Sequence, residues 1–270
     1  MKITKNRLRI IGAFALVLVV IILLIVLLVK SCSSDKTQKE GNTEATASQN
    51  VVSQQETTAE PPNEYMIDSV VPLLQDGLDA GCEVYACTVQ LQYLGFDIDE
   101  FEFAENYLVT SPIHYDDSYQ RYGPDMNSAY AGDLQTGYGI YAPGMAKCMN
   151  NYLSTQNTEA RAYPLQGVDL DTLCTDYVAN DIPVMVWATT YMIEPYEKAS
   201  WIVDYVDENA DSQLGDTEVW LEGEHCMTLV GYDEENYYFA DSMYGEITAY
   251  EKEVSKDRYA KIGSQAIVVK

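Results

Sequence analysis

The pattern of apolar and polar residues predicts helices followed by strands in the carboxy-terminal part of the chain. Between residues 81 and 94, apolar side chains recur at helical spacing, and Gly95 is a typical stop signal. The same spacing predicts helices over 99–108, 144–153 and 170–179. Short apolar or alternating runs then predict strands over residues 183–188, 201–206, 217–222, 226–230, 237–240, 247–250 and 266–269. Helices first and strands afterwards predict the α+β fold class.

The amino terminus contains a pattern typical of a membrane-spanning helix. Residues 10–29 form an unbroken run of 20 uncharged residues, most of them Ile, Leu and Val. At a rise of about 1.5 Å per residue, a helix of this length crosses the hydrocarbon core of a bilayer. A cleaved signal peptide fits less well, because its apolar core is usually shorter and Lys30 follows this run at once. We therefore expect an uncleaved transmembrane helix over 10–29.

The residues on either side of this helix predict its orientation and the domain organisation. Residues 1–9 contain four basic residues and no acid, so the positive-inside rule predicts a cytoplasmic tail over 1–9. Residues 30–64 are mostly polar, which predicts a disordered linker. All 22 tyrosines lie at or beyond Tyr65. We therefore expect one folded domain, over 65–270, outside the cytoplasm and anchored to the cell membrane of a bacterium.

The charge balance excludes one class of partner. The chain has 16 Lys and Arg residues against 42 Asp and Glu residues, which gives a net charge of −26. Nucleic-acid binding requires a basic surface, so we expect no nucleic-acid partner. The negative charge favours neutral or cationic peptides over polyanions.

Neither the cysteines nor the acidic residues are spaced as a convincing metal site. The cysteines and histidines lack the short paired spacings of a structural zinc site. Oxygen-bearing side chains over 207–218 follow the spacing of a calcium loop, but Ser212 stands where that loop requires glycine. We interpret 207–218 as an acidic hairpin tip and keep a calcium site as the alternative. We expect no metal and no cofactor.

Cys82 is a candidate nucleophile because of its position at the start of a predicted helix. It follows Gly81, which leaves room for a substrate carbonyl to approach. The positive end of the helix dipole and the free backbone N–H groups stabilise a thiolate at such a position. The side chain of Gln75 could donate an N–H to an oxyanion, together with the backbone amide of Cys82. The alternative is that Cys82 is a small buried apolar residue.

His225 and Asp241 are candidates for the partners of this thiol. His225 begins one predicted strand and Asp241 ends the next, and a turn over 233–236 joins the two strands. Antiparallel pairing would bring these ends together, so that the carboxylate could orient the imidazole ring. The other histidine, His114, lies in a polar loop, where we expect a solvent-exposed residue; a place in the substrate cleft is the alternative. A cysteine, a distant histidine and an acid on the adjoining strand are the groups that a cysteine hydrolase requires.

Four segments together resemble a known family: residues 71–83 with Gly81-Cys82-Glu83, residues 183–187, residues 224–226 with Glu224-His225-Cys226, and residues 231–241. They are similar to the stand-alone domains that resemble bacteriocin-processing (double-glycine-leader) cysteine peptidases of the papain-like clan. The resemblance covers 65–270. It implies a papain-like fold, with a helical half that bears the cysteine, an antiparallel-sheet half that bears the histidine, and a cleft between the halves.

The resemblance also implies a role for each candidate residue. Cys82 would be the nucleophile and His225 the general base and then the general acid. Asp241 would orient the ring, and Gln75 would donate to the oxyanion. The chain departs from the family pattern over 180–182, because a glycine commonly precedes the strand that follows. The 270 residues include no transporter or nucleotide-binding domain, so leader cleavage is not carried over and the substrate stays open.

These observations predict a membrane-anchored, extracytoplasmic cysteine hydrolase that cleaves an amide bond of a peptide or peptide-like substrate through an acyl-enzyme. A transglutaminase-like acyltransferase with the same triad is one alternative, and a catalytically silent surface module that holds a peptide is another.

The remaining cysteines leave the disulfide pairing open. Cys87 is expected in the core of its helix, and Cys226 is expected to face away from the cleft because it follows His225 on a strand. Cys148 and Cys174 could pair in an oxidising exterior.

Overall fold

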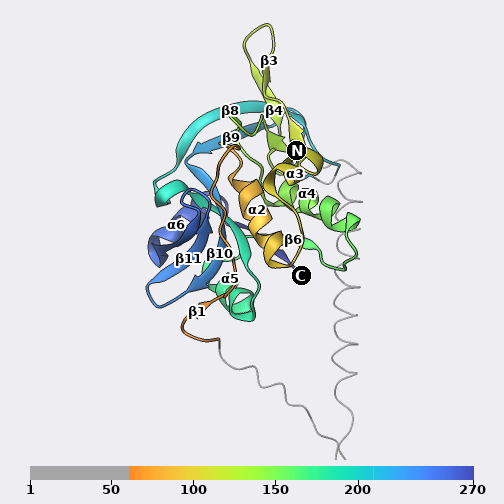
Figure 1. Cartoon of the computed structure of the whole chain (residues 1–270). Coiled ribbons are helices and arrows are strands. Elements are labelled where there is room, and N and C mark those ends of the chain that lie inside the picture. The colour runs from red at the N-terminus through yellow and green to blue at the C-terminus, as the bar shows by residue number, and fades with distance from the viewer. Residues whose placement is uncertain (1–60, 209) are drawn as a thin grey trace, which may run out of the picture. The chain divides into compact units, whose positions relative to one another are not determined.

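The computed structural model describes residues 61–208 and 210–270 (Figure 1). The predicted cytoplasmic tail over 1–9, the predicted transmembrane helix over 10–29 and nearly all of the predicted linker lie outside these residues. Within the described ranges, no helix has the length and apolar character needed to cross a bilayer.

Helix α2 (Cys82–Tyr93) lies at the centre of the domain and confirms the helix predicted over 81–94. Gly81 is its N-cap, and Gly95 after its end has a φ of 88°, which glycine adopts without a steric penalty. Its side chains are buried on nearly every face, which is typical of a helix enclosed in a core rather than lying on a surface. One side packs against strand β10 (Glu224–Tyr232).

The other predicted helices are also present, with small differences in length. They are α3 (Glu100–Asn106), α4 (Ala142–Thr155) and α5 (Leu170–Asp176). Asp99 and Asp169 cap α3 and α5, because each carboxylate accepts an N–H from the first turn. A further helix, α6 (Lys252–Lys261), was not predicted. It buries little more than Ser255 and Tyr259. Because so few of its side chains face the core, its sequence has no apolar stripe that would predict a helix.

The main sheet is antiparallel, with the strand order β12-β11-β10-β7-β13-β6, and the short strand β1 (Tyr65–Met66) is added to β10. The other strands of this sheet are β6 (Ala162–Gln166), β7 (Val184–Thr189), β10, β11 (Asn236–Asp241), β12 (Glu246–Glu251) and β13 (Gln265–Val269). The predicted antiparallel pairing of the strands that bear His225 and Asp241 is confirmed, with Thr228 opposite Ala240. In the turn between them, the Asp233 carboxylate accepts backbone N–H groups from the residues that follow.

A second, smaller sheet has the order β3-β4-β8-β9. Its strands are β3 (His114–Tyr115), β4 (Arg121–Pro124), β8 (Tyr196–Tyr205) and β9 (Thr217–Glu222). The predicted hairpin of β8 and β9 is confirmed, although β8 begins earlier than expected. The β3–β4 hairpin projects from the body of the domain (Figure 1). The two-residue strands β2 (Thr110–Ser111) and β5 (Tyr130–Ala131) pair with each other and are too short for a sequence pattern to predict.

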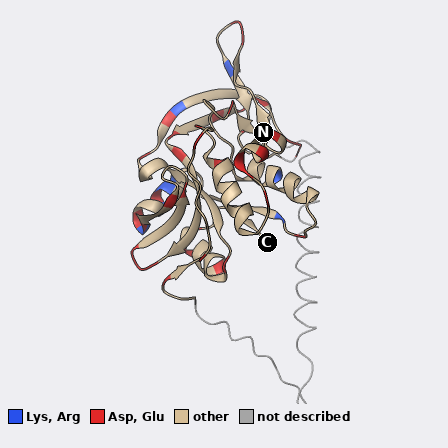
Figure 2. Ribbon diagram, in the orientation of Figure 1, with Lys and Arg blue, Asp and Glu red and all other residues tan. Residues whose placement is uncertain are grey.

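Both faces of the main sheet are covered, because its side chains alternate between two cores. On one face, Trp187 and Cys226 pack with residues of α2 and α4. On the other, Val186 and Met227 pack with Tyr259 of α6 and with residues of α5. The fold is therefore α+β, as predicted, and the start of α2 lies directly against the strand that begins at Glu224. In Figure 2 the ribbon carries more red acidic positions than blue basic ones.

Candidate active site

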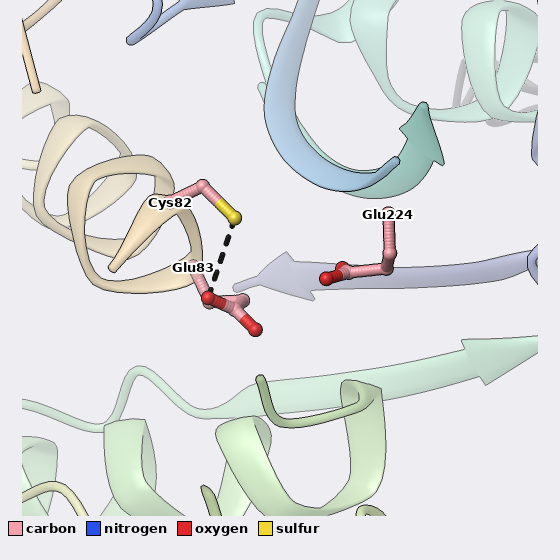
Figure 3. A group of neighbouring side chains, drawn as sticks. All are labelled: Cys82, Glu83 and Glu224. Carbon is pink, nitrogen blue, oxygen red and sulfur yellow. Dashed lines mark hydrogen bonds between the residues drawn. The ribbon is translucent and has the colours of Figure 1, made fainter. Parts of the chain in front are cut away.

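Cys82 is the first residue of α2, and its sulfur lies against strand β10. The backbone N–H of Cys226 donates to the sulfur at 3.4 Å. The thiol in turn donates to Oε2 of Glu83, also at 3.4 Å (Figure 3). The residue is 9% exposed. The candidate nucleophile therefore touches the peptide bond that directly follows His225.

The surroundings of Cys82 favour the neutral thiol. Burial raises its pKa well above the ordinary value, and the carboxyl groups of Glu83 and Glu224 raise it further. The N–H of Cys226 acts in the opposite direction. The sequence indicated a thiolate stabilised by the helix terminus, but it contained no information on burial or on the two carboxyl groups. In the structure, burial and the two carboxyl groups oppose the effect expected of the helix terminus.

The structure brings His225 and Asp241 together in a buried hydrogen bond. Nε2 of the ring donates to Oδ1 of Asp241 at 2.8 Å, and the two side chains are 2% and 0% exposed. Asp241 also accepts from the Met243 N–H at 3.0 Å and from the Tyr250 hydroxyl at 2.9 Å. Burial alone would raise the pKa of Asp241, but the hydrogen bond and charge of His225, with these two donors, lower it overall. Because Nε2 is occupied, Nδ1 is the ring nitrogen that remains, and among the described residues no hydrogen bond joins the ring to the Cys82 sulfur.

Gln75 lies beside the same strand end, with its amide occupied. Its Nε2 donates at 2.9 Å to the carbonyl groups of Leu78 and of Asp79. Its Oε1 accepts from the hydroxyl of Ser242 at 3.0 Å, next to Asp241. Both amide protons therefore hold the loop that leads to Cys82, and donation to an oxyanion requires one of these bonds to be released.

Two acids beside Cys82, one buried and one half-buried, were not singled out as site residues in the sequence. Glu83 is 0% exposed, and its Oε1 accepts the N–H of Ile140 at 2.8 Å. Glu224 has a buried Oε1 with no hydrogen-bond partner in the described part of the chain. Burial raises the pKa of Glu83 to about 7, and burial together with the charge of Glu83 raises the pKa of Glu224 well above its ordinary value. The sequence feature that could have identified these two acids is their position, since each acid adjoins a candidate catalytic residue.

The sulfur and one oxygen from each carboxyl group lie within 4.8 Å of one another. Such a group could be bridged by a cation or by shared protons. The hydrogen bond from the thiol to Glu83 is one such shared proton. Gly139, with a φ of +120°, borders the pair, and a Cβ there would lie 2.5 Å from Oε1 of Glu83.

The alternative calcium segment over 207–218 directs several of its oxygens toward protein groups. Asp207 forms an ion pair with Lys147 at 2.7 Å, and Glu218 accepts the N–H of Met126 at 3.1 Å. The hydroxyl of Ser212 donates to Asp125 at 3.1 Å. Position 209 lies outside the described residues.

All five cysteines in the described ranges are free and buried: Cys82, Cys87, Cys148, Cys174 and Cys226. Cys148 and Cys174 belong to different cores, so the structure does not contain the bridge between them. Cys87 is buried in its helix as expected. His114 is half exposed in β3, where Nε2 lies 3.2 Å from Asp204.

Exposed aromatic and apolar side chains lie next to the Asp241 end of the site. The rings of Tyr191 and Tyr244 are 5.6 Å apart, and each residue is about half exposed. Leu74 is exposed as well and lies against Gly245. Tyr191 has a φ of 56°, a conformation that is strained for a bulky residue. These residues form an apolar surface beside the buried histidine and aspartate.

Comparison with known proteins identifies the family. A profile of the Peptidase_C39 like family matches residues 51–267. A proposed C39-like peptidase from Bacillus anthracis is similar in structure, with 23% identity and a TM-score of 0.63, over 77% of this chain and 98% of that one. Xylellain, a cysteine protease from Xylella fastidiosa, aligns over 77% of this chain and 86% of its own, with 13% identity and a TM-score of 0.38. No curated protein sequence matches significantly. The profile match shows that the chain belongs to the Peptidase_C39-like family.

Proposed function

We propose that this protein is a membrane-anchored, extracytoplasmic cysteine peptidase that cleaves an amide bond through an acyl-enzyme. Cys82 is the nucleophile, His225 the general base and acid, and Asp241 the residue that orients the ring. The observation that carries the proposal is the buried 2.8 Å bond between His225 and Asp241, on strands that pack against a cysteine at a helix amino terminus.

The reaction begins when the Cys82 thiol passes its proton to Nδ1 of His225. The thiolate attacks the carbonyl carbon of the substrate, and a C–S bond forms while the carbonyl oxygen takes the negative charge. The imidazolium then protonates the amide nitrogen, the C–N bond breaks and the amine leaves. A water molecule that gives its proton to His225 hydrolyses the thioester, which releases the acid and restores the thiol.

Asp241 supports this cycle by holding the ring and stabilising its positive charge. Its lowered pKa keeps it ionised throughout the neutral range. The donors from Tyr250 and Met243 keep the carboxylate in position for the ring. For Gln75 we propose the role of oxyanion donor, together with the backbone N–H of Cys82, after substrate has replaced one of the carbonyl groups that the amide now binds.

The substrate that we propose is a peptide or peptide-like molecule. The family match supports this class, and the apolar surface of Leu74, Tyr191 and Tyr244 beside the site suits an extended chain with apolar side chains.

Membrane anchoring rests on the apolar run over 10–29 and the basic residues before it. External protease added to intact cells should digest the domain, while an epitope at the amino terminus should stay protected. Digestion only after lysis would contradict the proposed orientation.

Incubation of the chain with a quenched-fluorescent peptide library tests the activity. Cys82→Ser should abolish cleavage, whereas Cys174→Ser, which changes a buried cysteine in the other core, should retain it. Cleavage that survives Cys82→Ser would exclude Cys82 as the nucleophile. Addition of an amine separates hydrolysis from acyl transfer, since a transferase would form the new amide. Peptide binding without turnover in the unchanged chain would indicate a silent binding module.

A further inference from the structure

Two carboxyl groups that the proposed reaction does not use lie against its nucleophile. Oε2 of Glu83 accepts the thiol hydrogen bond of Cys82 at 3.4 Å, and Glu83 has no exposed surface. Glu224 approaches from β10, and its buried Oε1 has no partner among the described residues. Figure 3 shows the Glu224 carboxyl directed toward Cys82 and Glu83. The thiol is thus held by an acid rather than by the base.

No cation balances this carboxyl pair in residues 61–208 and 210–270. The ion pairs in these ranges involve neither Glu83 nor Glu224. The titratable groups around the pair are Tyr130 of β5, Tyr141 before α4, Glu218 of β9, and His225 and Cys226 of β10. All of them are neutral or acidic except His225, whose Nε2 is bound to Asp241.

Two neighbouring carboxyl groups without a cation do not both ionise, because each negative charge opposes the other. Burial adds to this effect and raises the pKa of Glu83 to about 7, with Glu224 also raised. The pair therefore retains protons well above the ordinary range of a carboxylic acid, and its charge changes near neutral pH.

We propose that Glu83, with Glu224 beside it, is a positioning residue that holds Cys82 as a neutral thiol, so that the charge of this carboxyl pair controls the ionisation of the nucleophile. The inference deepens the proposed function, because it concerns the nucleophile of that site. Ionised Glu83 opposes a second negative charge on the sulfur at 3.4 Å. Protonated Glu83 carries no charge and does not oppose a thiolate, so the thiol proton can then pass to His225.

This arrangement has a consequence for pH. Below neutral pH, Glu83 is protonated and the thiolate forms with less opposition. As the pH rises through 7, Glu83 ionises and the pKa of the thiol rises with it. The increase in thiolate that alkali normally produces is therefore reduced over this interval.

Alkylation of Cys82 tests the proposal without any substrate. The full chain, in detergent and with a chelator present, is treated with iodoacetamide between pH 5.5 and 9, and the modification of each cysteine is followed by mass spectrometry. The variant is Glu83→Gln, which keeps an oxygen for the N–H of Ile140. Glu218→Gln is the matched control, since burial also raises the pKa of Glu218 but its oxygens bond to Met126 and Val219 rather than to Cys82. Cys87, fully buried, reports unfolding.

We expect Glu83→Gln to react at Cys82 about tenfold faster than the unchanged chain at pH 8, with the ratio falling toward one at pH 5.5. Glu218→Gln should match the unchanged chain. An equal or slower rate for Glu83→Gln at pH 8, with Cys87 still protected, would overturn the proposal. So would a ratio that is the same at every pH, because a structural effect alone does not follow the titration of Glu83.

A second measurement needs no variant and can still overturn the proposal if Glu83→Gln does not fold. In the unchanged chain, the logarithm of the Cys82 alkylation rate should rise with a slope below one between pH 6 and 8. A slope of one throughout would overturn the proposal. Turnover of peptides does not enter either measurement, so a failure of the proposed peptidase activity is recognised separately.

Discussion

Replacement of Glu83 by Gln should stabilise the folded domain at pH 8 and change its stability little at pH 5. Burial raises the pKa of Glu83 from 4.5 to about 7, so the folded state keeps a proton that the unfolded chain has lost. A group whose pKa is raised on folding contributes stability that is complete below its unfolded pKa and is lost as the pH rises through the folded pKa. Each pKa unit corresponds to about 1.4 kcal/mol, so ionisation of Glu83 should lower the free energy of unfolding by about 3 kcal/mol at pH 8.

Urea unfolding at the two pH values measures this effect. The fluorescence of Trp187 and Trp201 reports on the domain within the full chain, because both indole rings are buried. The chain has 42 acidic residues, so the comparison uses the difference between Glu83→Gln and the unchanged chain at the same pH. At pH 8 we expect the free energy of unfolding of Glu83→Gln to exceed that of the unchanged chain by at least about 1 kcal/mol, which is about a third of the full loss worked out above. A difference that is equal at pH 5 and pH 8 would show that Glu83 does not titrate in this range and would refute the reasoning.

Three further changes have expected outcomes. Asp241→Asn should reduce kcat for peptide cleavage by about 10²–10⁴, because the ring loses its orienting charge, whereas Tyr250→Phe should reduce it by about tenfold or less; equal losses would contradict the role of Asp241. Gln75→Ala should lower kcat by about 10²–10³ with little change in KM, and a change in KM alone would exclude an oxyanion role. Gly139→Ala should lower the thermal midpoint, since its Cβ would collide with Glu83 at 2.5 Å; scanning calorimetry that finds no decrease would contradict this.

Much of the fold was predictable because the long elements carry strong periodic patterns. The helix over 81–94 and the strand at 183–188 are recognisable in the sequence and are present in the structure as α2 and β7. The missed elements have weak patterns for physical reasons. Helix α6 buries too few side chains to produce an apolar stripe, and β2 and β5 have two residues each. Their positions depend on distant partners rather than on local sequence.

The part of the candidate site that depends on strand pairing was predictable from the sequence. A turn between two antiparallel strands was enough to bring His225 and Asp241 together. The state of Cys82 was not predictable in this way, because it depends on burial and on Glu224, which lies 142 positions along the chain. The occupied amide of Gln75 has the same explanation, since its partners lie in a tight loop whose path the sequence does not reveal.

The way in which the chain enters the domain has a mechanical consequence. Strand β1, the first strand after residue 60, pairs Tyr65 with Tyr232 and Met66 with Gly231 of β10, and the Tyr232 hydroxyl binds the carbonyl of Pro62. A force pulling on the preceding residues would therefore load β10 first, the strand that also carries His225. Strand β1 contributes only two residue pairs, whereas β10 is also paired to β7 and β11, so β1 would peel away before β10 moved, and the imidazole would keep its place under a moderate load.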